Sequence, residues 1–423
     1  MSLFGRNGGD APAGILGPRI MLVLTVLVLT LIGFVMIYSA SSVSILSDAA
    51  SKGALSSANP AAYLLDQLFF AVIGVVCAFA LWRFFPIDTW MDSKWLWIVY
   101  GAGILGLILT AVMGTTALGA QRWLSIGPVS LQPSEFAKIT LVLMAANIFA
   151  QLENGELEPR DALVWAFVTI VLPLLFLYMT QSDLGTSAII AVGVLAVMWI
   201  GEVPTRVIVA IVIGLGLFGL VGIFGTGYRS DRLVVYNPWN DGDNGYGSGY
   251  QTIHSFYAFS EGGLFGVGLG NSREKFDYLP EAETDFVFSI IGEEFGLVGA
   301  LFVIGLFLVL LYAGMQIAHA SPTPFGAMVA GSCTIMLVFQ AFLNIGCVIG
   351  LVPTTGKPLP FVSSGGSSLI ATFIMVGLIL SVSRAADAPS VYERRRADLR
   401  VVRASGGKDS DVPARARRSR ARR

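Results

Sequence analysis

The chain has 423 residues, of which 55% are hydrophobic and only 13% are charged, and its formal net charge is −1. A soluble domain usually carries about 25% charged residues. The composition therefore excludes an ordinary soluble protein and indicates a chain whose surface is covered largely by lipid.

Apolar runs long enough to cross a bilayer recur along the chain. A hydrocarbon core of about 30 Å needs roughly 20 apolar residues per helix, and the runs lack the alternation of a lipid-facing β-barrel. The first run, Ile20 to Tyr38, is uncharged and longer than a signal-peptide core, so we interpret it as an uncleaved span. The predicted fold class is an all-α polytopic membrane protein of about ten transmembrane helices, near residues 19–40, 65–85, 95–114, 133–152, 162–180, 183–200, 203–225, 286–316, 325–349 and 366–386.

Lys and Arg are distributed unequally over the two sets of alternating loops. One set, together with the tail from Arg384 to Arg423, carries 19 of the 27 Lys and Arg residues, and the other set carries 7. The positive-inside rule makes the first set cytoplasmic, and the tail decides this result. The predicted domains are a cytoplasmic N-terminal segment (1–18), a transmembrane domain (19–386) and a basic, disordered cytoplasmic tail (387–423), which lies on anionic lipid or serves as a docking peptide.

The segments on the predicted outer side are the unusual ones. Residues 226–285, between spans 7 and 8, are rich in Gly, Tyr, Asn and Asp and too polar to span. Two shorter outer stretches, 114–132 and 350–366, are partly apolar and punctuated by Gly and Pro. Such stretches often lie in the interface or re-enter the membrane. We therefore expect the function to reside on the outer face.

Six ionisable residues lie at or inside predicted spans. A charge at the centre of a transmembrane helix costs about 2.5–3.5 kcal/mol on insertion scales, so such residues are functional candidates. The alternative is an interior salt bridge or a side chain that reaches the interface. The six are Asp66, Glu135, Lys138, Asp183, Glu293 and Glu294.

Glu135 and Lys138 form the strongest of these candidates. They lie three residues apart on one helix face, directly after a Pro-Ser helix start. With Arg122 and Gln132 upstream, the pair predicts a polar floor beneath an outward cavity. A purely structural ion pair is the alternative.

Two acidic residues and one glycine pair precede apolar helices. Asp183 fits a functional role or a helix N-cap. Asp285 is the last polar residue before the span at 286–316, and poorer solvation there would move its pKa toward the working range of a general base. An N-cap is again the alternative. Gly365 and Gly366 stand among serines just before a helix, where free backbone amides suit an anion.

Cysteine and histidine give no sign of a metal centre. The cysteines Cys77, Cys333 and Cys347 lie in apolar runs without ligand or disulfide spacing, and the two histidines form no HExxH or Cys/His cluster. A structural zinc site is therefore not expected from the sequence.

Four long motifs resemble those of the SEDS family (shape, elongation, division and sporulation). They are GAQRWLSIGPVSLQPSEFAKI, QSDLGTSAII, GGLFGVGLGNSREKFDYLPEAETDFVFSIIGEEFG and GLVPTTGKPLPFVSSGGSSLI, and the resemblance covers residues 19–386. The stretch GLFGVGLGNSREKFDYLPEA resembles the division member, FtsW, more than the elongation member, RodA. Two positions depart from the family's pattern: Glu283 stands where a histidine is common, and Ser364 where an aromatic residue is usual.

The resemblance implies a peptidoglycan glycosyltransferase that polymerises lipid II, the undecaprenyl-pyrophosphoryl disaccharide-pentapeptide, at the outer face of the bacterial cytoplasmic membrane. Asp285 matches the family's essential aspartate and is the expected catalytic base. The expected substrate-binding residues are Arg122, Gln132, Glu135, Lys138, Asp183, Lys275, Glu281, Ser363, Gly365, Gly366 and Ser367. The leaving pyrophosphate would need cationic groups or a divalent cation, Mg or Mn; the metal ligands are unknown, and no organic cofactor is expected.

The expected partners also follow from the resemblance. They are membrane lipids, a class B penicillin-binding protein and other division proteins at the septum, with no nucleic acid. A lipid II flippase or transporter is the main alternative, because it too has many helices with intramembrane charges, although no inverted repeat is visible. An elongation-type polymerase, a channel and a scaffold of the division complex are the further alternatives.

Overall fold

The computed structural model describes residues 14–53, 59–91, 93–117, 120–127, 129–224, 236–243 and 245–386. Within them, eight helices are long and apolar enough to cross a membrane, and two further apolar helices, which begin at Leu184 and Thr205, occupy the two remaining predicted spans. The predicted all-α polytopic class is therefore confirmed. Residues 1–13, the tail at 387–423, and the outer cations Arg229 and Arg232 lie outside the described residues.

The spanning helices follow the chain in the predicted order. They are α1 (Leu16–Ser51), α2 (Ala62–Phe84), α3 (Lys94–Met113), α4 (Pro133–Glu153), the continuous rod α5–η3–α6 (Pro159–Ala166, Phe167–Val171, Leu172–Gln181), α7 (Leu184–Ile200), α8 (Thr205–Phe224), α10 (Val287–His319), α11 (Pro324–Val348) and α12 (Gly366–Ala386). The rod has a π-helical turn at η3, just before Pro173, because proline cannot donate to the carbonyl four residues earlier.

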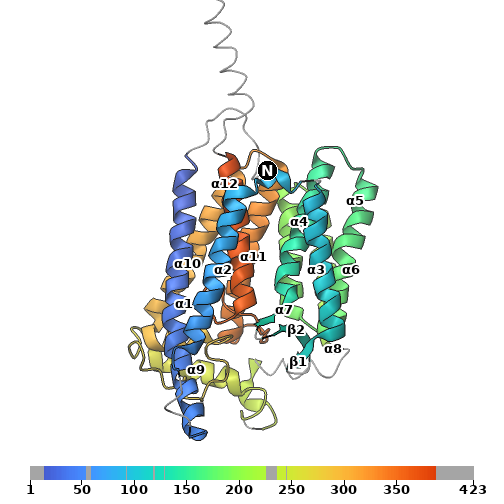
Figure 1. Ribbon diagram of the computed structural model, residues 1–423. Coiled ribbons are helices and arrows are strands. Elements are labelled where there is room, and N and C mark those ends of the chain that lie inside the picture. Colours follow the sequence, from blue (N-terminus) through green and yellow to red (C-terminus); the bar gives the residue numbers. More distant parts are fainter. Residues whose placement is uncertain are drawn as a thin grey trace, which may run out of the picture.

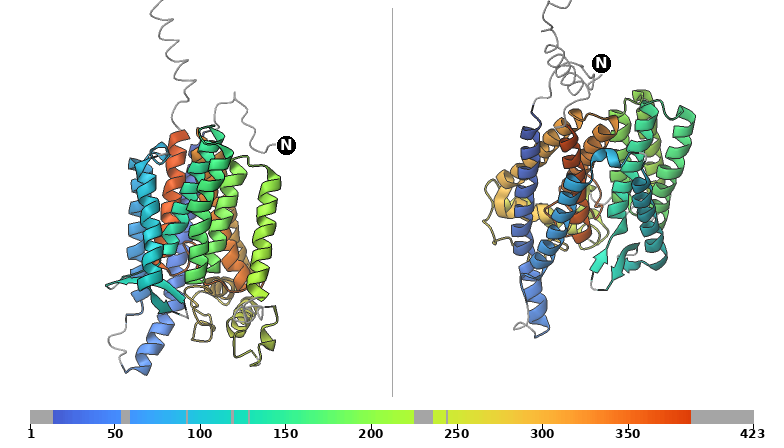
Figure 2. Two further views of the ribbon diagram at one scale, coloured as in Figure 1. Left: turned by 90° about the vertical axis from the view of Figure 1, so that its right-hand side faces the viewer. Right: turned by 45° about the horizontal axis from the view of Figure 1, so that its top comes forward.

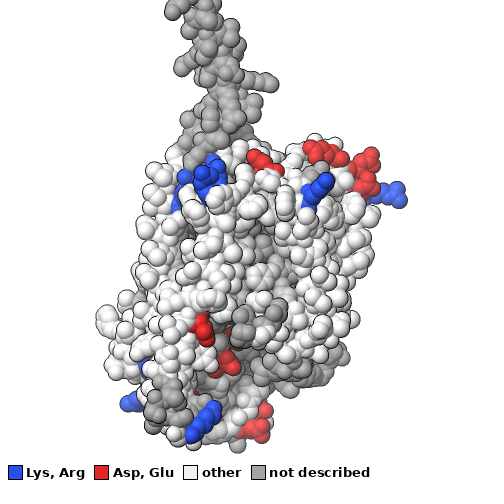
Figure 3. All heavy atoms as spheres, in the orientation of Figure 1, with Lys and Arg blue, Asp and Glu red and all other residues white. Residues whose placement is uncertain are grey.

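The helices stand side by side in one bundle (Figure 1). The start of α1 and the end of α12 lie at the same end, and the strands and α9 (Tyr250–Gly262) gather at the opposite end (Figures 1 and 2). Charged side chains on the face drawn in Figure 3 collect at these two ends and leave an uncharged band between them. Such a band is the surface that lipid covers.

The most buried helices, α4, α11 and α12, form the centre of the bundle. Helix α2 packs along α12, α1 and α11 pack along α10, and α7 lies against α4 and α11. Helix α8 is peripheral, with its main contact to α7. The central position of α4 explains why charged residues in its first turns can avoid lipid altogether.

Two outer segments are more ordered than the sequence predicted. Three short strands form a small antiparallel sheet in the order β1-β2-β3: β1 (Thr115–Ala117), β2 (Ala120–Ile126) and β3 (Val129–Leu131). The long loop contains the short helix η5 (Pro238–Asn240) and α9. Between these two helices, both carboxylate oxygens of Asp241 accept backbone N–H groups, four in all, so a glycine-rich turn is held in one conformation.

The last outer stretch, residues 350–365, re-enters the bundle, as the sequence suggested. A side chain at Gly33, in the middle of α1, would overlap the carbonyl oxygen of Phe361, which is itself buried. Gly33 lies about 21 Å along α1 from Arg19, at 1.5 Å per residue, whereas the hydrocarbon core is about 30 Å thick. On the scale of α1, the stretch therefore reaches well into the bundle from the end that carries the strands and α9, and it brings polar groups with it.

Candidate active site

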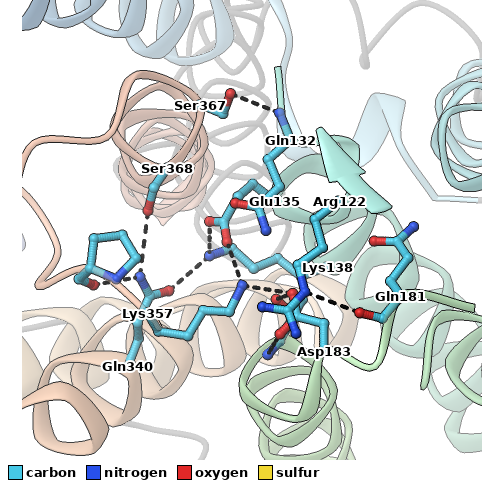
Figure 4. A network of polar contacts seen from close by, with 12 residues as sticks. Arg122, Gln132, Glu135, Lys138, Gln181, Asp183, Gln340, Lys357, Ser367 and Ser368 are labelled. Atoms are coloured by element: carbon cyan, nitrogen blue, oxygen red, sulfur yellow. Dashed lines mark hydrogen bonds and ion pairs between the residues drawn. The ribbon is translucent and has the colours of Figure 1, made fainter. Parts of the chain in front are cut away.

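Four ionised side chains meet inside the bundle (Figure 4). The Lys138 ammonium donates to Glu135 Oε2 at 2.7 Å, and the Lys357 ammonium donates to Asp183 Oδ2 at 2.8 Å. Lys357 Nζ also lies 3.5 Å from Glu135 Oε1, which joins the two pairs. The four side chains are at most 1% exposed. Two carboxylates and two ammonium groups cancel in formal charge, which makes their burial tolerable.

Different elements supply the members of this buried ion cluster. Glu135 and Lys138 come from the first two turns of α4, and Lys357 comes from the re-entrant stretch. Asp183 is the N-cap of α7, where it accepts from the Thr186 backbone N–H at 3.0 Å and the Thr186 hydroxyl at 2.8 Å. The capping role that the sequence offered for Asp183 is therefore present, together with an interior ion pair to Lys357.

Two amides of α11 extend the cluster, and sequence reasoning missed both. Gln340 Oε1 accepts from Lys138 Nζ at 2.8 Å, and its Nε2 donates to the Pro358 carbonyl at 2.9 Å. Asn344, one helical turn further, donates from Nδ2 to the carbonyls of Asp285 at 2.8 Å and Lys357 at 2.9 Å. The signal available in the sequence was a pair of amides four residues apart in an otherwise apolar helix.

Asn344 thus brings Asp285 next to the re-entrant stretch. A Cβ at Gly356 would lie 3.6 Å from Asp285 Oδ2, so the carboxylate faces the backbone just before Lys357. Asp285 is partly exposed, and no hydrogen bond or ion pair to its carboxylate occurs among the described residues. The residue at the N-cap of α10 is Phe286, and no side chain caps that helix. The N-cap interpretation of Asp285 is therefore wrong.

The surroundings of Asp285 raise its pKa. Loss of solvation is the larger cause and the nearby Glu281 carboxylate the smaller one, while Lys357 and Arg122 act in the opposite direction; the resulting pKa is about 6. A carboxyl group with this pKa is ionised at neutral pH and is a stronger base than an ordinary aspartate. Glu281 itself is exposed and accepts a hydrogen bond from the Thr284 hydroxyl at 2.7 Å.

Arg122 and Gln132 frame the site from the β-sheet side. Arg122, on β2, donates from Nε and Nη2 to the carbonyls of Gln181 and Ser182 at 3.0 Å each, at the end of α6. It is partly exposed and close enough to influence the pKa of Asp285. Gln132 uses its backbone N–H, which donates to Ser367 Oγ at 3.0 Å. Of the outer cations within the described ranges, Lys52, Arg122 and Arg273 keep solvent exposure, and the others are buried.

The predicted anion site at the start of α12 is largely occupied by the protein. Gln67 of α2 accepts from the Gly365 N–H at 3.3 Å and donates to the Ser363 carbonyl at 3.1 Å. The Ser363 hydroxyl accepts from the Leu359 N–H at 2.9 Å, and a side chain at Gly366 would overlap Phe70. The expectation that these backbone amides stand open is wrong for Gly365, because a neighbouring helix already satisfies it.

Lys275 belongs to a second buried cluster. Its ammonium donates to Glu294 Oε1 at 3.0 Å and to the Ser39 hydroxyl at 3.1 Å, which ties the outer loop to α10 and α1. Glu293 accepts from the Ser272 hydroxyl at 2.5 Å and the Arg273 N–H at 2.6 Å. The sequence offered an interior ion pair as the alternative to a functional role for Glu293 and Glu294. Such a pair is present for Glu294, with Lys275 as its partner. Asp66, in contrast, is exposed near the start of α2.

The two positions that depart from the SEDS pattern touch each other. The Ser364 N–H donates to the Glu283 carbonyl at 2.9 Å. This bond joins the segment of Asp285 to the end of the re-entrant stretch, independently of Asn344. Neither Glu283 nor Ser364 contributes to the buried ion cluster, so the departures leave that cluster intact.

Within the described ranges, no three His, Cys, Asp or Glu side chains converge as metal ligands. The carboxylates of Glu135 and Asp183 are already paired with ammonium groups, whereas Glu281, Glu283 and Asp285, in the segment next to the cluster, keep solvent access. Magnesium commonly binds one or two protein carboxylates together with substrate phosphates. The residues present therefore fit a divalent cation that arrives with a phosphorylated substrate.

Comparison with known proteins gives consistent matches over nearly the whole chain. The model of the cell cycle protein family named for FtsW, RodA and SpoVE matches residues 19–388. Stage V sporulation protein E of Bacillus subtilis is 39% identical over 380 residues, which cover 87% of this chain and 97% of the relative. The probable peptidoglycan glycosyltransferase FtsW of Trichlorobacter lovleyi is 36% identical over 372 residues, covering 86% and 92%.

Solved structures show the same architecture. A chain from a peptidoglycan synthase complex, described for its coordination of polymerization and crosslinking, aligns with a TM-score of 0.65 and 29% identity over 87% of this chain and 98% of its own. The rod shape determining protein RodA of Thermus thermophilus aligns with a TM-score of 0.60 and 28% identity over 87% and 97%.

Proposed function

The chain belongs to the cell cycle protein family of FtsW, RodA and SpoVE, and from that premise we propose that it is a peptidoglycan glycosyltransferase acting at the outer face of the bacterial cytoplasmic membrane. Its substrate is lipid II, which it polymerises into glycan strands. The observation that carries this proposal is the Asp285 carboxylate, which is partly exposed, free of ion pairs among the described residues and raised in pKa to about 6.

Asp285 acts as the general base. It removes the proton from the 4-hydroxyl of the acceptor GlcNAc, whose oxygen then bonds to the anomeric carbon of the donor MurNAc while the bond to undecaprenyl pyrophosphate breaks. A positioned base typically accelerates such a step by about 10²–10⁴-fold. Asn344 holds the backbone of Asp285 against the re-entrant stretch, so the base has a fixed position relative to the bundle.

Among the cations that the structure describes, Arg122 is the best placed for the leaving pyrophosphate. It is partly exposed, whereas Lys357 and Lys275 are buried and paired with carboxylates. A divalent Mg or Mn ion, when bound, would add further stabilisation of the departing charge. Binding of substrate by Glu135, Lys138 and Asp183 stays a prediction. In this structure these side chains face one another, and Asp183 and Glu135 contact Lys357 of the re-entrant stretch.

The cellular setting extends the same proposal. A relative described above carries the name FtsW, that of the division member, which supports septal synthesis over elongation. The start of α1 and the end of α12 share one side (Figure 1), and the basic tail follows the latter, which supports cytoplasmic termini. The match to a synthase complex with polymerization and crosslinking activities supports a class B penicillin-binding protein as partner.

Polymerisation in detergent tests the enzyme against the flippase. We expect the purified chain, supplied with lipid II alone or with its transpeptidase partner, to produce glycan strands in micelles. Micelles contain no membrane that separates two compartments, so transport cannot account for strands formed in them. Movement of lipid II across the membrane of proteoliposomes, with no strands formed in proteoliposomes or in micelles, would overturn the proposal.

A further inference from the structure

Helix α10 is broken at Gly296, and a segment of the outer loop fills the break. Gly296 has φ 67° and ψ −166°, a conformation outside the helical region that glycine adopts readily. The break leaves backbone groups of α10 without helical partners, which is costly in an apolar setting. The loop supplies them: Val267 and Gly268 donate to the carbonyls of Glu293 and Glu294 at 2.9 and 3.0 Å.

The same segment accepts from the other side of the break. Leu297 N–H donates to the Gly263 carbonyl at 2.9 Å, and Val298 N–H donates to the Leu264 carbonyl at 3.2 Å. The approach is so close that a side chain at Gly266 would overlap the carbonyl of Glu294. The segment is thus fixed to α10 by four backbone hydrogen bonds, at the level of residues 293–298.

Residues 262–272, here named the outer flap, contain no charged residue. They are bounded by Glu261 and Arg273, whose side chains form an ion pair at 3.5 Å with Arg273 79% exposed. Between these charges the flap presents large apolar side chains outward: Leu264 is 62% exposed, Phe265 80% and Leu269 54%. A loop in water would not usually expose three such side chains together.

The lipid-facing surface of α10 begins at the same level. Residues 287–294 are all buried by protein, and the first large apolar side chain exposed on α10 is Phe295, followed by Leu297 and Val298. From Phe295 to His319 the helix has 25 residues, or about 37 Å at 1.5 Å per residue, enough to cross a core of about 30 Å. The boundary between water and hydrocarbon therefore lies near Glu294, and the apolar part of the flap lies at or below it.

We propose that the outer flap is inserted in the outer leaflet and contacts lipid acyl chains. The flap continues the lipid-facing surface of α10, and its flanking charged residues, Glu261 and Arg273, lie at the boundary between water and hydrocarbon. Four of its backbone polar groups pair with the broken helix and so do not need water as a partner. Insertion anchors the long outer loop beside α10, while Asn344 holds the end of the loop at Asp285. The inference requires a membrane protein but does not depend on the proposed reaction.

Spin-label accessibility in lipid nanodiscs tests the proposal. Phe265→Cys and, separately, Leu269→Cys are labelled with a nitroxide in the full chain carrying Cys77→Ser, since Cys77 is the partly exposed one of the three native cysteines. Oxygen concentrates in acyl chains, whereas a nickel chelate stays in water. The matched control is Tyr246→Cys, an 82% exposed aromatic position elsewhere in the same outer loop.

We expect the ratio of oxygen to nickel collision rates to be several-fold higher at positions 265 and 269 than at position 246. A ratio equal to that of the control would place the flap in water and overturn the proposal. Low accessibility to both reagents would show that protein covers the flap, which would overturn it equally. Phe265 and Leu269 are both largely exposed, so neither substitution removes a packed side chain.

Discussion

Removing one charge from the buried ion cluster should destabilise the whole protein. In Lys357→Met, the Asp183 and Glu135 carboxylates, which now lie 2.8 and 3.5 Å from Lys357 Nζ, keep a single ammonium group, Lys138, between them. All four side chains are at most 1% exposed, so water cannot compensate. Breaking a buried pair by removing one partner costs about 3–5 kcal/mol, a large part of a typical total of about 5–15 kcal/mol.

The free energy of unfolding can be measured by denaturant titration of the purified protein in mixed micelles. The informative comparison is with Lys357→Met/Asp183→Asn, which removes one charge of each sign and keeps the cluster neutral. We expect the double variant to recover more than half of the loss. Lys52→Met, at an exposed position, is the control and should change stability by less than about 1 kcal/mol.

Two results would refute this reasoning. One is a Lys357→Met protein as stable as the Lys52→Met control, which would mean that the cluster is solvated or carries no net interaction. The other is a double variant less stable than Lys357→Met, which would mean that Asp183 stabilises the protein mainly as the cap of α7. Exchanging Glu135 and Lys138 is a poorer test, because a lysine at position 135 would face Lys357.

Two further predictions concern Asp285. Burial, and to a smaller extent Glu281, raise the pKa of Asp285 to about 6, so below that pH the base form is lost and the polymerisation rate should fall about tenfold per pH unit. Glu281→Gln removes a charge that disfavours ionisation of Asp285, so the acid limb of the pH–rate profile should move to lower pH. An acid limb that stays at the same pH or moves to higher pH would contradict this. Asn344→Leu should lower stability by about 1–3 kcal/mol, because one buried and one partly buried carbonyl lose their donor, and it should also lower the polymerisation rate. Asn271→Ala, at an exposed asparagine, should leave both unchanged. A fully active Asn344→Leu protein would show that Asp285 is positioned without it.

The spans could be predicted because lipid imposes a simple constraint on sequence. A helix that faces hydrocarbon needs roughly 20 apolar residues, and this pattern is visible without any partner. The start of α4 after Pro133 and the cap of α7 at Asp183 were visible for a similar reason, since helix termini depend on local chemistry. The bounds of these helices accordingly fell close to the predicted ones.

Contacts between distant segments could not be predicted in the same way. Nothing local indicates that Lys357 pairs with Asp183, a residue 174 positions away, or that Gln340 and Asn344 turn toward the re-entrant stretch. The break at Gly296 was hidden as well, because a glycine in an apolar helix is usually a packing residue. These features arise from the way helices pack, and the single-residue patterns of the sequence do not encode that packing directly.

The polymerisation activity of Asp285→Asn is the most direct test of the central claim. The substitution keeps the size of the side chain and removes its basicity, and the Asn344 bond is retained because it uses the backbone carbonyl of residue 285. We predict that the purified variant folds normally and forms glycan strands from lipid II at least about 10²-fold more slowly than the parent. Strand formation by Asp285→Asn at the parent's rate would contradict the account.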